Sequence, residues 1–286
     1  MTAPPMACGI NVYCSGPADP GLGAALDDLA SLGYTHIAFA PMGHADVDVT
    51  ALRQTMANAG IAPIAMAGLS PEADVSSASA DIRQRGIALL RSTVDFAHDL
   101  GADQLNGVSY ALFGERSQPY PPDRFAASAE AVGQVADYAA QAGITLTFEV
   151  VNRYETSMLN TAAQARDYLE RSGSTNLRVH LDTYHMGIEE ADPAGAIAAT
   201  VPVLGYLELG QSGRGSLLTG SVDIAAAIAA ARDAGFTGRF GLEAFTRQLL
   251  DEGGGNGLAI WRQTYTDPHT IAAEAIDLVR AAYQEP

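Results

Sequence analysis

Short apolar segments alternate with longer amphipathic segments eight times along the chain, and this alternation restricts the possible folds more than any other feature. Short apolar runs bounded by turn residues predict buried strands, and the amphipathic segments predict helices. The predicted strands span residues 8–13, 36–40, 61–67, 102–107, 144–150, 177–182, 203–209 and 239–245. The predicted helices span residues 22–32, 48–59, 78–100, 123–142, 161–171, 222–234 and 267–284, with one short helix near 193–200. Eight strand–helix units of about 30–40 residues fit one closed parallel barrel. We therefore predict an α/β fold, a (β/α)₈ TIM barrel that forms a single domain over residues 1–286.

A doubly wound open sheet is the main alternative to this barrel. Such a sheet commonly carries a glycine-rich nucleotide-binding loop after its first strand. Residues 13–21, with the sequence YCSGPADPG, do not match that loop. No stretch rich in proline, serine or charge divides the chain into two domains. The missing nucleotide-binding loop, together with acidic residues that recur at the ends of the predicted strands, favours the closed barrel.

Residues typical of helix ends stand at the expected boundaries. Capping side chains are expected at Asp48 or Thr50, Thr161 and Asp267. Left-handed residues that terminate helices are expected at Gly33, Gly60, Gly101, Gly143 and Gly235. The segment 251–257, DEGGGNG, is expected to be a mobile, solvated glycine-rich loop, with a substrate lid as the alternative.

The chain is strongly acidic, with a formal net charge of −17. A field of this sign opposes binding to nucleic acid and to anionic membrane surfaces. No apolar run reaches the roughly 20 residues that span a bilayer, and the N-terminal sequence does not match a signal peptide. The two cysteines, Cys8 and Cys14, are poorly spaced for a disulfide. We expect a cytoplasmic protein with reduced thiols, no nucleic-acid partner and no membrane partner.

Four acidic residues occupy equivalent places near the ends of the last four predicted strands: Glu149, Asp182, Glu208 and Glu243. The carboxyl ends of the strands meet at the mouth where barrel active sites form. Carboxylates held this close repel one another, and a divalent cation with a preference for oxygen ligands removes the repulsion. The pattern therefore predicts a metal site for Mn²⁺, Mg²⁺ or a similar ion, formed by these four residues.

Further polar residues follow these acids on the loops. Asn152, Arg153 and Glu155 follow the fifth strand, His185 follows the sixth, and Arg214 follows the seventh. His185 lies three residues after a predicted metal ligand, which favours a functional role over a structural one. Arg214 could neutralise the acidic mouth or orient a substrate oxygen. The glycines around Arg214 are interpreted as a plain turn.

At these residues the sequence resembles the ketose 3-epimerases, the family of D-tagatose and D-allulose 3-epimerases within the xylose isomerase-like barrels. The similarity rests on EVVNRYE (149–155) and LDTYHMGIEE (181–190), supported by GRG (213–215), GLEAF (241–245) and AIWRQ (259–263). The resemblance implies that Glu149 and Glu243 bind metal and shuttle protons, and that Asp182 is a metal ligand. It implies that Glu155, His185 and Arg214 hold the substrate's oxygens. It also implies a homo-oligomer, dimeric or tetrameric, that uses Mn²⁺, Mg²⁺ or Co²⁺, with Mn²⁺ preferred.

The chain departs from the pattern of this family at its seventh strand. The family places a metal-binding histidine where this chain has Glu208, and relatives often carry Glu and Asn or His where Gln211 and Gly213 stand. Four carboxylates around one divalent ion leave a formal local charge of −2, which favours oxygen-loving ions and raises the pKa of at least one carboxyl group.

The function expected from these residues is metal-dependent epimerisation of a ketose or keto-sugar at C3. One carboxylate, Glu149 or Glu243, removes the C3 proton to give an enediolate, and the other returns a proton on the opposite face. The alternatives left open are another enolising reaction (aldose–ketose isomerisation or β-elimination from a 3-keto-glycoside), a phosphodiesterase of the endonuclease IV type, and a barrel without catalytic activity that serves as a binding subunit. The net charge and the lack of several ligating histidines disfavour the phosphodiesterase.

Overall fold

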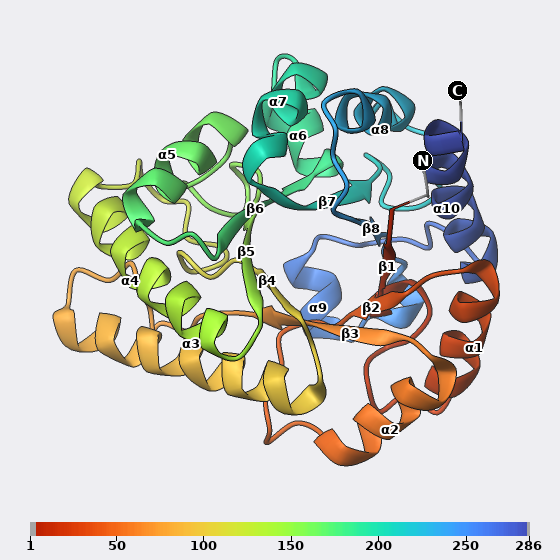
Figure 1. The fold of residues 1–286 in the computed structure, drawn as a ribbon, viewed down its shortest axis with the longest axis horizontal. Coiled ribbons are helices and arrows are strands. Elements are labelled where there is room, and N and C mark those ends of the chain that lie inside the picture. The colour runs from red at the N-terminus through yellow and green to blue at the C-terminus, as the bar shows by residue number, and fades with distance from the viewer. Residues whose placement is uncertain (1–3, 285–286) are drawn as a thin grey trace.

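The structure, a computed structural model that describes residues 4–284, is a closed barrel of eight parallel strands in sequence order (Figure 1). This result confirms the predicted (β/α)₈ barrel. The strands are β1 Met6–Gly9, β2 His36–Ala38, β3 Ala62–Ala67, β4 Gln104–Gly107, β5 Thr145–Val150, β6 Leu177–Asp182, β7 Leu204–Gly210 and β8 Arg239–Glu243. β1 pairs with both β2 and β8, so the sheet has no free edge.

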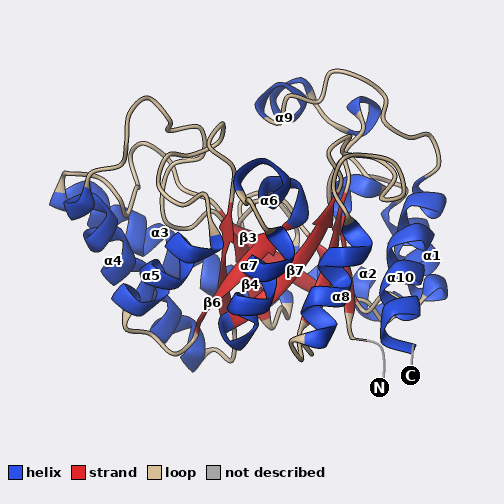
Figure 2. Cartoon of the chain, turned by 90° about the horizontal axis from the view of Figure 1, so that it is seen from above, coloured by secondary structure: helices blue, strands red, loops and turns tan. Residues whose placement is uncertain are grey.

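Helices surround the barrel, and the loops that follow the strands gather at one end of it, with α9 above them (Figure 2). The helices are α1 Leu22–Leu32, α2 Val49–Ala59, α3 Ala80–Leu100, α4 Pro122–Gln141, α5 Ala162–Ser172, α6 Thr183–Glu189, α7 Pro193–Thr200, α8 Ile224–Asp233, α9 Glu252–Gly257 and α10 Pro268–Gln284. Within residues 4–284, no helix combines the length and apolar character needed to cross a membrane.

The helix ends follow the local signals of the sequence. The Asp48 side chain accepts the backbone N–H of Ala51 at the start of α2. Thr161 and Gln164 form a reciprocal capping box at the start of α5. The predicted left-handed glycines all have positive φ: Gly33, Gly60, Gly101, Gly143 and Gly235. These boundaries determine where each helix ends and where the chain turns toward the next strand.

Three segments differ from the sequence-based prediction. The first strand is shorter and earlier than residues 8–13, since Ile10–Val12 forms a 3₁₀ turn. α6 follows β6 without a loop, because Asp182 ends the strand and its side chain accepts the N–H of Tyr184. The predicted loop at 251–257 is wrong: it contains α9, where the Asp251 carboxylate accepts the N–H of Gly254 and offsets the low helix propensity of glycine.

The register of β7 aligns the inward side chains near the mouth of the barrel. The pairing of β6 with β7 shifts by one residue, so that Gly205 is an extra residue on β7. His180 then lies opposite Tyr206, and Asp182 lies opposite Glu208. A one-residue shift exchanges the two faces of a strand. The shift therefore determines that Glu208 shares the barrel interior with Asp182.

The close packing of α4 on α5 generates a stability prediction. Gly133 is buried in α4, and a Cβ atom there would overlap the backbone carbonyl oxygen of Ser172 at the end of α5. We expect Gly133→Ala to lower the unfolding free energy by about 1–3 kcal/mol, since the backbone of α5 must move. Gly23, exposed in α1 with nothing within 4 Å of its added Cβ, is the matched control.

Alanine at Gly23 is expected to leave stability unchanged or to raise it by up to about 1 kcal/mol, because alanine favours helix. Urea unfolding followed by circular dichroism measures both variants. Equal effects of the two substitutions would show that contact with Ser172 does not control packing of these helices.

Candidate active site

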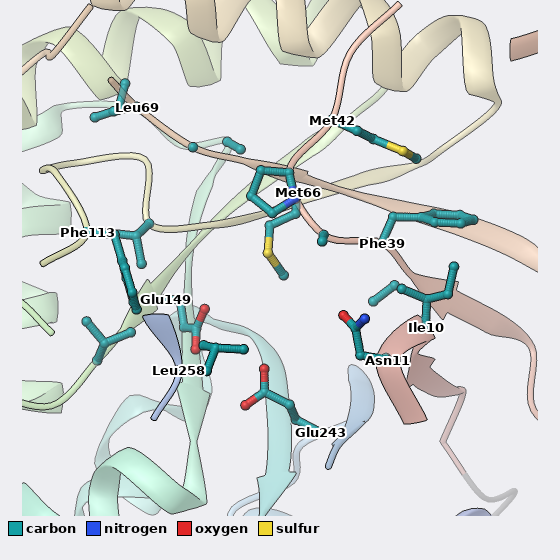
Figure 3. A pocket seen from close by; sticks show the side chains of 18 of the residues that line it. Ile10, Asn11, Phe39, Met42, Met66, Leu69, Phe113, Glu149, Glu243 and Leu258 are labelled. Carbon is teal, nitrogen blue, oxygen red and sulfur yellow. The ribbon is translucent and has the colours of Figure 1, made fainter. Parts of the chain in front are cut away.

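A cavity of about 660 Å³ opens at the carboxyl ends of the strands. Charged side chains from the later strands form one part of its lining, and Figure 3 shows Glu149 and Glu243 pointing into it from separate strands. Apolar side chains from the earlier units form much of the rest, among them Ile10, Phe39, Met42, Met66, Leu69 and Phe113. The cavity therefore has a charged region and an extended apolar region.

The structure brings together the four acids that the sequence singled out. Oxygen atoms of Asp182, Glu208 and Glu243 lie within 4.8 Å of one another. Glu149 forms similar close groups with Asp182 and His185, and with His180 and Glu208. Asp182 is fully buried, Glu208 and Glu149 are nearly so, and Glu243 is partly exposed.

The buried carboxyl groups have perturbed acidities. Burial, together with the nearby charges of Glu243 and Glu208, raises the pKa of Glu149 to about 8. Burial and neighbouring carboxylates also raise the pKa values of Asp182 and Glu208 well above their ordinary range. Ionising all of them in this space is costly unless a cation is present. The clustered hard oxygens therefore fit a divalent ion of the kind that prefers carboxylate ligands.

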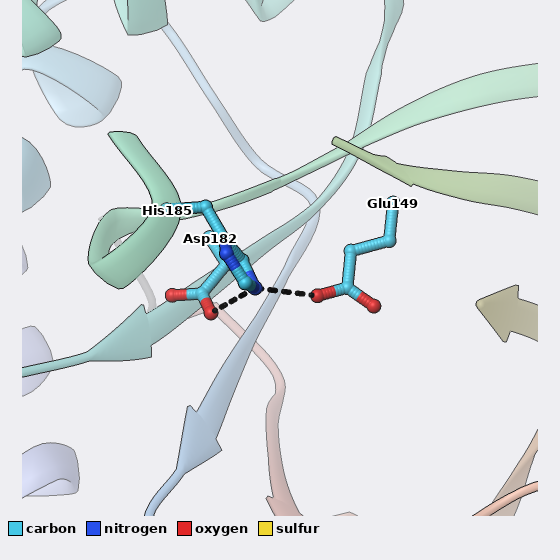
Figure 4. A group of neighbouring side chains, drawn as sticks. All are labelled: Glu149, Asp182 and His185. Carbon is cyan, nitrogen blue, oxygen red and sulfur yellow. Dashed lines mark ion pairs between the residues drawn. The ribbon is translucent and has the colours of Figure 1, made fainter. Parts of the chain in front are cut away.

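His185 lies among the carboxylates, on the first turn of α6. Its Nε2 is 3.4 Å from Oε1 of Glu149 and 3.5 Å from Oδ2 of Asp182 (Figure 4). Its Nδ1 accepts the backbone N–H of Asn152 at 3.1 Å. Burial lowers the pKa of His185, although the carboxylates around it act in the opposite direction. Because a backbone N–H can only donate, the neutral ring carries its proton on Nε2 and directs this donor toward the acids.

Glu155 lies beside His185 at the edge of the carboxylate group. Its carboxylate is 3.8 Å from Nε2 of His185 and accepts the side-chain amide of Asn152 at 3.1 Å. Asn152 thus connects the loop after β5 to α6, and it is a positioning contact that the sequence did not reveal. Burial raises the pKa of Glu155.

Arg214 reaches the acids from the loop after β7. Its guanidinium forms ion pairs with Asp182, at 3.4 Å, and with Glu243. It stacks 3.4 Å from the centroid of the Tyr184 ring. Burial acts to lower the pKa of Arg214, but the charges of Glu243 and Asp182 outweigh it and raise the value. The guanidinium therefore remains charged in a nearly buried position.

Gln211 holds the loop that carries Arg214. Its side-chain amide donates to the carbonyls of Leu217 and Val222 and accepts the N–H groups of Ser212 and Val222. The backbone carbonyl of Gln211 also accepts the N–H of Arg214 at 2.8 Å. Arg214 itself has a φ of 55°, so this turn is built around a residue in the left-handed region.

Sequence reasoning missed His180, which lies on β6 below the four acids. It is fully buried, and its Nε2 lies 3.0 Å from Oε2 of Glu208. The available signal was its position two residues before Asp182, since alternate residues of a strand share one face. A histidine on the inward face of the strand that ends in Asp182 was therefore placed to reach the same site.

Comparisons with known proteins agree with this geometry. The family model described as xylose isomerase-like TIM barrel matches residues 26–282. An L-ribulose 3-epimerase of Mesorhizobium japonicum is 36% identical, with 92% of this chain and 89% of that protein covered. A ketose 3-epimerase of Arthrobacter globiformis is 38% identical, with 87% and 86% covered. The crystal structure of a D-allulose 3-epimerase from Methylomonas sp. in complex with D-allulose superimposes with a TM-score of 0.92 at 33% identity, covering 98% of both chains.

Two findings lead to the same assignment. The family model spans nearly the whole barrel, and the relatives share more than a third of their residues over most of both chains. The chain belongs to the xylose isomerase-like TIM barrel family and, within it, to the ketose 3-epimerases.

Proposed function

We propose that this protein is a divalent-metal-dependent ketose 3-epimerase. The observation that carries this proposal is the pair Glu149 and Glu243, which point into one cavity from β5 and β8 beside a buried carboxylate cluster (Figure 3). Inversion of a carbon next to a ketone needs two proton-transfer groups, one for each face of the substrate. The relatives named L-ribulose 3-epimerase and ketose 3-epimerase support the choice of this reaction over other enolising reactions.

The metal is proposed to be held by Glu149, Asp182, Glu208 and Glu243. Their clustered carboxylate oxygens suit hard divalent ions, and among these we propose Mn²⁺, the ion that the family resemblance favours, with Mg²⁺ or Co²⁺ as alternatives. A bound divalent ion would act as a Lewis acid on the ketone, which makes the adjacent C–H proton more acidic.

The protein's own groups then handle the proton and the oxygens. Glu149 or Glu243 removes the proton from C3, and the other delivers a proton to the opposite face of the planar intermediate. His185 directs its Nε2–H toward this space, so it is proposed to donate to a substrate oxygen near the carbonyl. Glu155 and Arg214 are proposed to hold further oxygens at the same end.

Two further properties are proposed, the assembly of the protein and its cellular location. Exposed aromatic side chains on loops, Tyr154 at 63% and Trp261 at 66%, are available for burial between subunits and support a dimer or tetramer. The free thiols of Cys8 and Cys14 support a reducing compartment, the cytoplasm.

The proton-transfer assignment predicts the isotope behaviour of a Glu243→Gln variant. An amide can neither accept nor return a proton, so conversion of a ketose in D₂O into its C3 epimer carrying deuterium at C3, which needs both glutamates, should fall by about 10²–10⁴-fold. Proton NMR of a ketose incubated with enzyme and Mn²⁺ measures exchange at C3 and, separately, at C1. Glu130→Gln, on the exposed face of α4, is the control and should exchange normally.

Mn²⁺ binding by the Glu243→Gln variant must be measured in parallel, because Glu243 is also a proposed ligand. Full conversion to the deuterated C3 epimer by this variant would disprove the assignment. Exchange confined to C1 in the unmodified protein would instead indicate aldose–ketose isomerisation.

The raised carboxyl pKa values predict how the stability of the metal-free protein depends on pH. The pKa of Glu149 is higher in the folded protein, about 8, than its ordinary value of 4.5. Folding then favours the protonated form, so the associated stability is present below pH 4.5 and is lost as pH rises toward 8. The melting temperature of metal-free protein should therefore fall across this window.

Mn²⁺ binding requires ionised carboxylates, so the stabilisation produced by saturating Mn²⁺ should grow over the same window. Thermal unfolding at several pH values, with and without Mn²⁺, measures both effects. A melting temperature that rises steadily with pH in the absence of metal would contradict the assigned direction of these pKa shifts.

The apolar part of the cavity predicts weak recognition of the sugar's far end. Among its lining side chains are Met42, Met66, Leu69 and Phe113, which cannot pair with hydroxyl groups. A site that hydrogen-bonds a hydroxyl rejects the analogue that lacks it, whereas an apolar wall does not. A ketohexose without its C6 hydroxyl should therefore keep kcat/KM within about tenfold of the parent sugar.

The matched control is a ketohexose without its C1 hydroxyl. Its loss should be clearly larger, about 10–100-fold, because the charged groups near the carbonyl then lack a partner. Initial rates for both analogues measure the contrast, and a larger loss for the C6 analogue would overturn the proposed orientation of the substrate.

A further inference from the structure

His180 occupies the layer of the barrel directly below the carboxylate cluster. It lies opposite Tyr206 in the β6–β7 pairing, and their rings meet edge to face with centroids 4.7 Å apart. Its Nε2 is 3.0 Å from Oε2 of Glu208, and both side chains are almost completely buried. This contact places an imidazole behind one member of the proposed metal centre.

Arg214, His185 and His180 contact different members of the carboxylate cluster. Arg214 pairs with Asp182 and Glu243, and His185 lies near Glu149 and Asp182. His180 pairs with Glu208 from the interior. Glu208 is therefore held from below, on the side away from the cavity mouth, while the other acids are contacted from α6 and from the loop after β7.

The direction of this hydrogen bond follows from the chemistry of the partners. A Glu208 carboxylate that holds a cation is ionised and can only accept, so in the metal-bound site His180 donates from Nε2. Its Nδ1 then has no proton and, among the described residues, no hydrogen-bond partner. One oxygen of Glu208 is thereby committed to His180, and the other can face a cation.

The backbone is shaped to allow this pair. The extra residue on β7, Gly205, brings Tyr206 beside His180 and Glu208 into the interior. A Cβ at Gly241 would overlap the Tyr206 hydroxyl, so the ring fits only because β8 has a glycine there. The Tyr206 ring in turn holds the plane of the His180 imidazole. The contact is therefore part of how the barrel is built, not a chance approach of two flexible side chains.

We propose that His180 is a positioning residue of the metal centre, which fixes the Glu208 carboxylate so that its second oxygen is directed at the ion. Metal sites commonly place a carboxylate behind a ligating imidazole, and here the order is reversed, with the imidazole behind a carboxylate. The inference rests on the proposed role of Glu208 as a ligand. It does not depend on which glutamate transfers the proton.

The test is the affinity for Mn²⁺, measured by calorimetry on the full chain. His180→Leu removes the donor and should weaken Mn²⁺ binding by about 10–100-fold, as removal of such supporting contacts typically does. His180→Gln retains an N–H donor and should bind within about threefold of the unmodified protein. His98→Leu, on the exposed face of α3, controls for loss of a histidine elsewhere.

A double-mutant cycle with Glu208→Gln tests whether His180 acts through Glu208. In the Glu208→Gln background, adding His180→Leu should weaken Mn²⁺ binding by less than about threefold. An equal loss in both backgrounds would overturn the inference, as would unchanged binding by His180→Leu. Circular dichroism of the metal-free variants confirms folding, and His180→Phe, a planar ring without a donor, replaces the leucine variant if that variant does not fold, with the same expected loss.

The proposed metal centre and the proposed positioning role of His180 would be disproved by different results. Absence of Mn²⁺, Mg²⁺ and Co²⁺ binding by the unmodified protein would disprove the proposed metal centre. Metal binding that depends on Glu208 but not on His180 would leave the metal centre intact and disprove only the positioning role.

Discussion

The concentration of carboxylates at the mouth of the barrel is the constraint on which the rest of the site depends. Three acids have oxygens within 4.8 Å of one another, and Asp182 is completely buried. In a medium of low polarity such charges repel strongly and favour protonation. This repulsion is reduced in part by the stacked Arg214, the Nε2–H of His185 and the interior His180. The carboxyl pKa values in the cluster are nevertheless raised, so these three groups do not remove the repulsion. The remaining deficit of positive charge is the physical reason to expect a divalent ion.

Glycines near this cluster matter as much as its charged side chains, because they leave space for those side chains. A Cβ at Gly210 would lie 2.7 Å from Oδ1 of Asp182, so the end of β7 can approach that carboxylate only as glycine. Thr183 then bonds both the N–H and the carbonyl of Gly210, which ties α6 to β7. Asp182 therefore ends a strand, caps a helix and faces the cluster at once, because the neighbouring strand leaves space for it.

The barrel and the main acids could be predicted from sequence because both produce regular signals. Strand–helix alternation and glycines after helices recur along the chain, and an acid at the end of an apolar strand stands out against its surroundings. α6 and α9 have no such signal, since both are short, both contain glycine, and each begins at an aspartate that caps its first turn. His180 was missed for a related reason: a single histidine inside an apolar strand resembles a core residue. Its contact with Glu208 depends on the shifted register of β7, which residue types alone do not reveal.

Glu208 and Gln211, on β7 and the loop after it, differ from the family pattern in ways that offset each other in charge. The resemblance to ketose 3-epimerases implied a histidine where Glu208 stands and often a glutamate where Gln211 stands. Glu208 adds a negative charge that His180 and a cation must balance, whereas Gln211 removes one from the adjoining loop. A carboxylate at position 211 could not donate to the carbonyls of Leu217 and Val222, as the amide does. The amide thus keeps the Arg214 loop closed without further negative charge, and Arg214 remains available to Asp182 and Glu243.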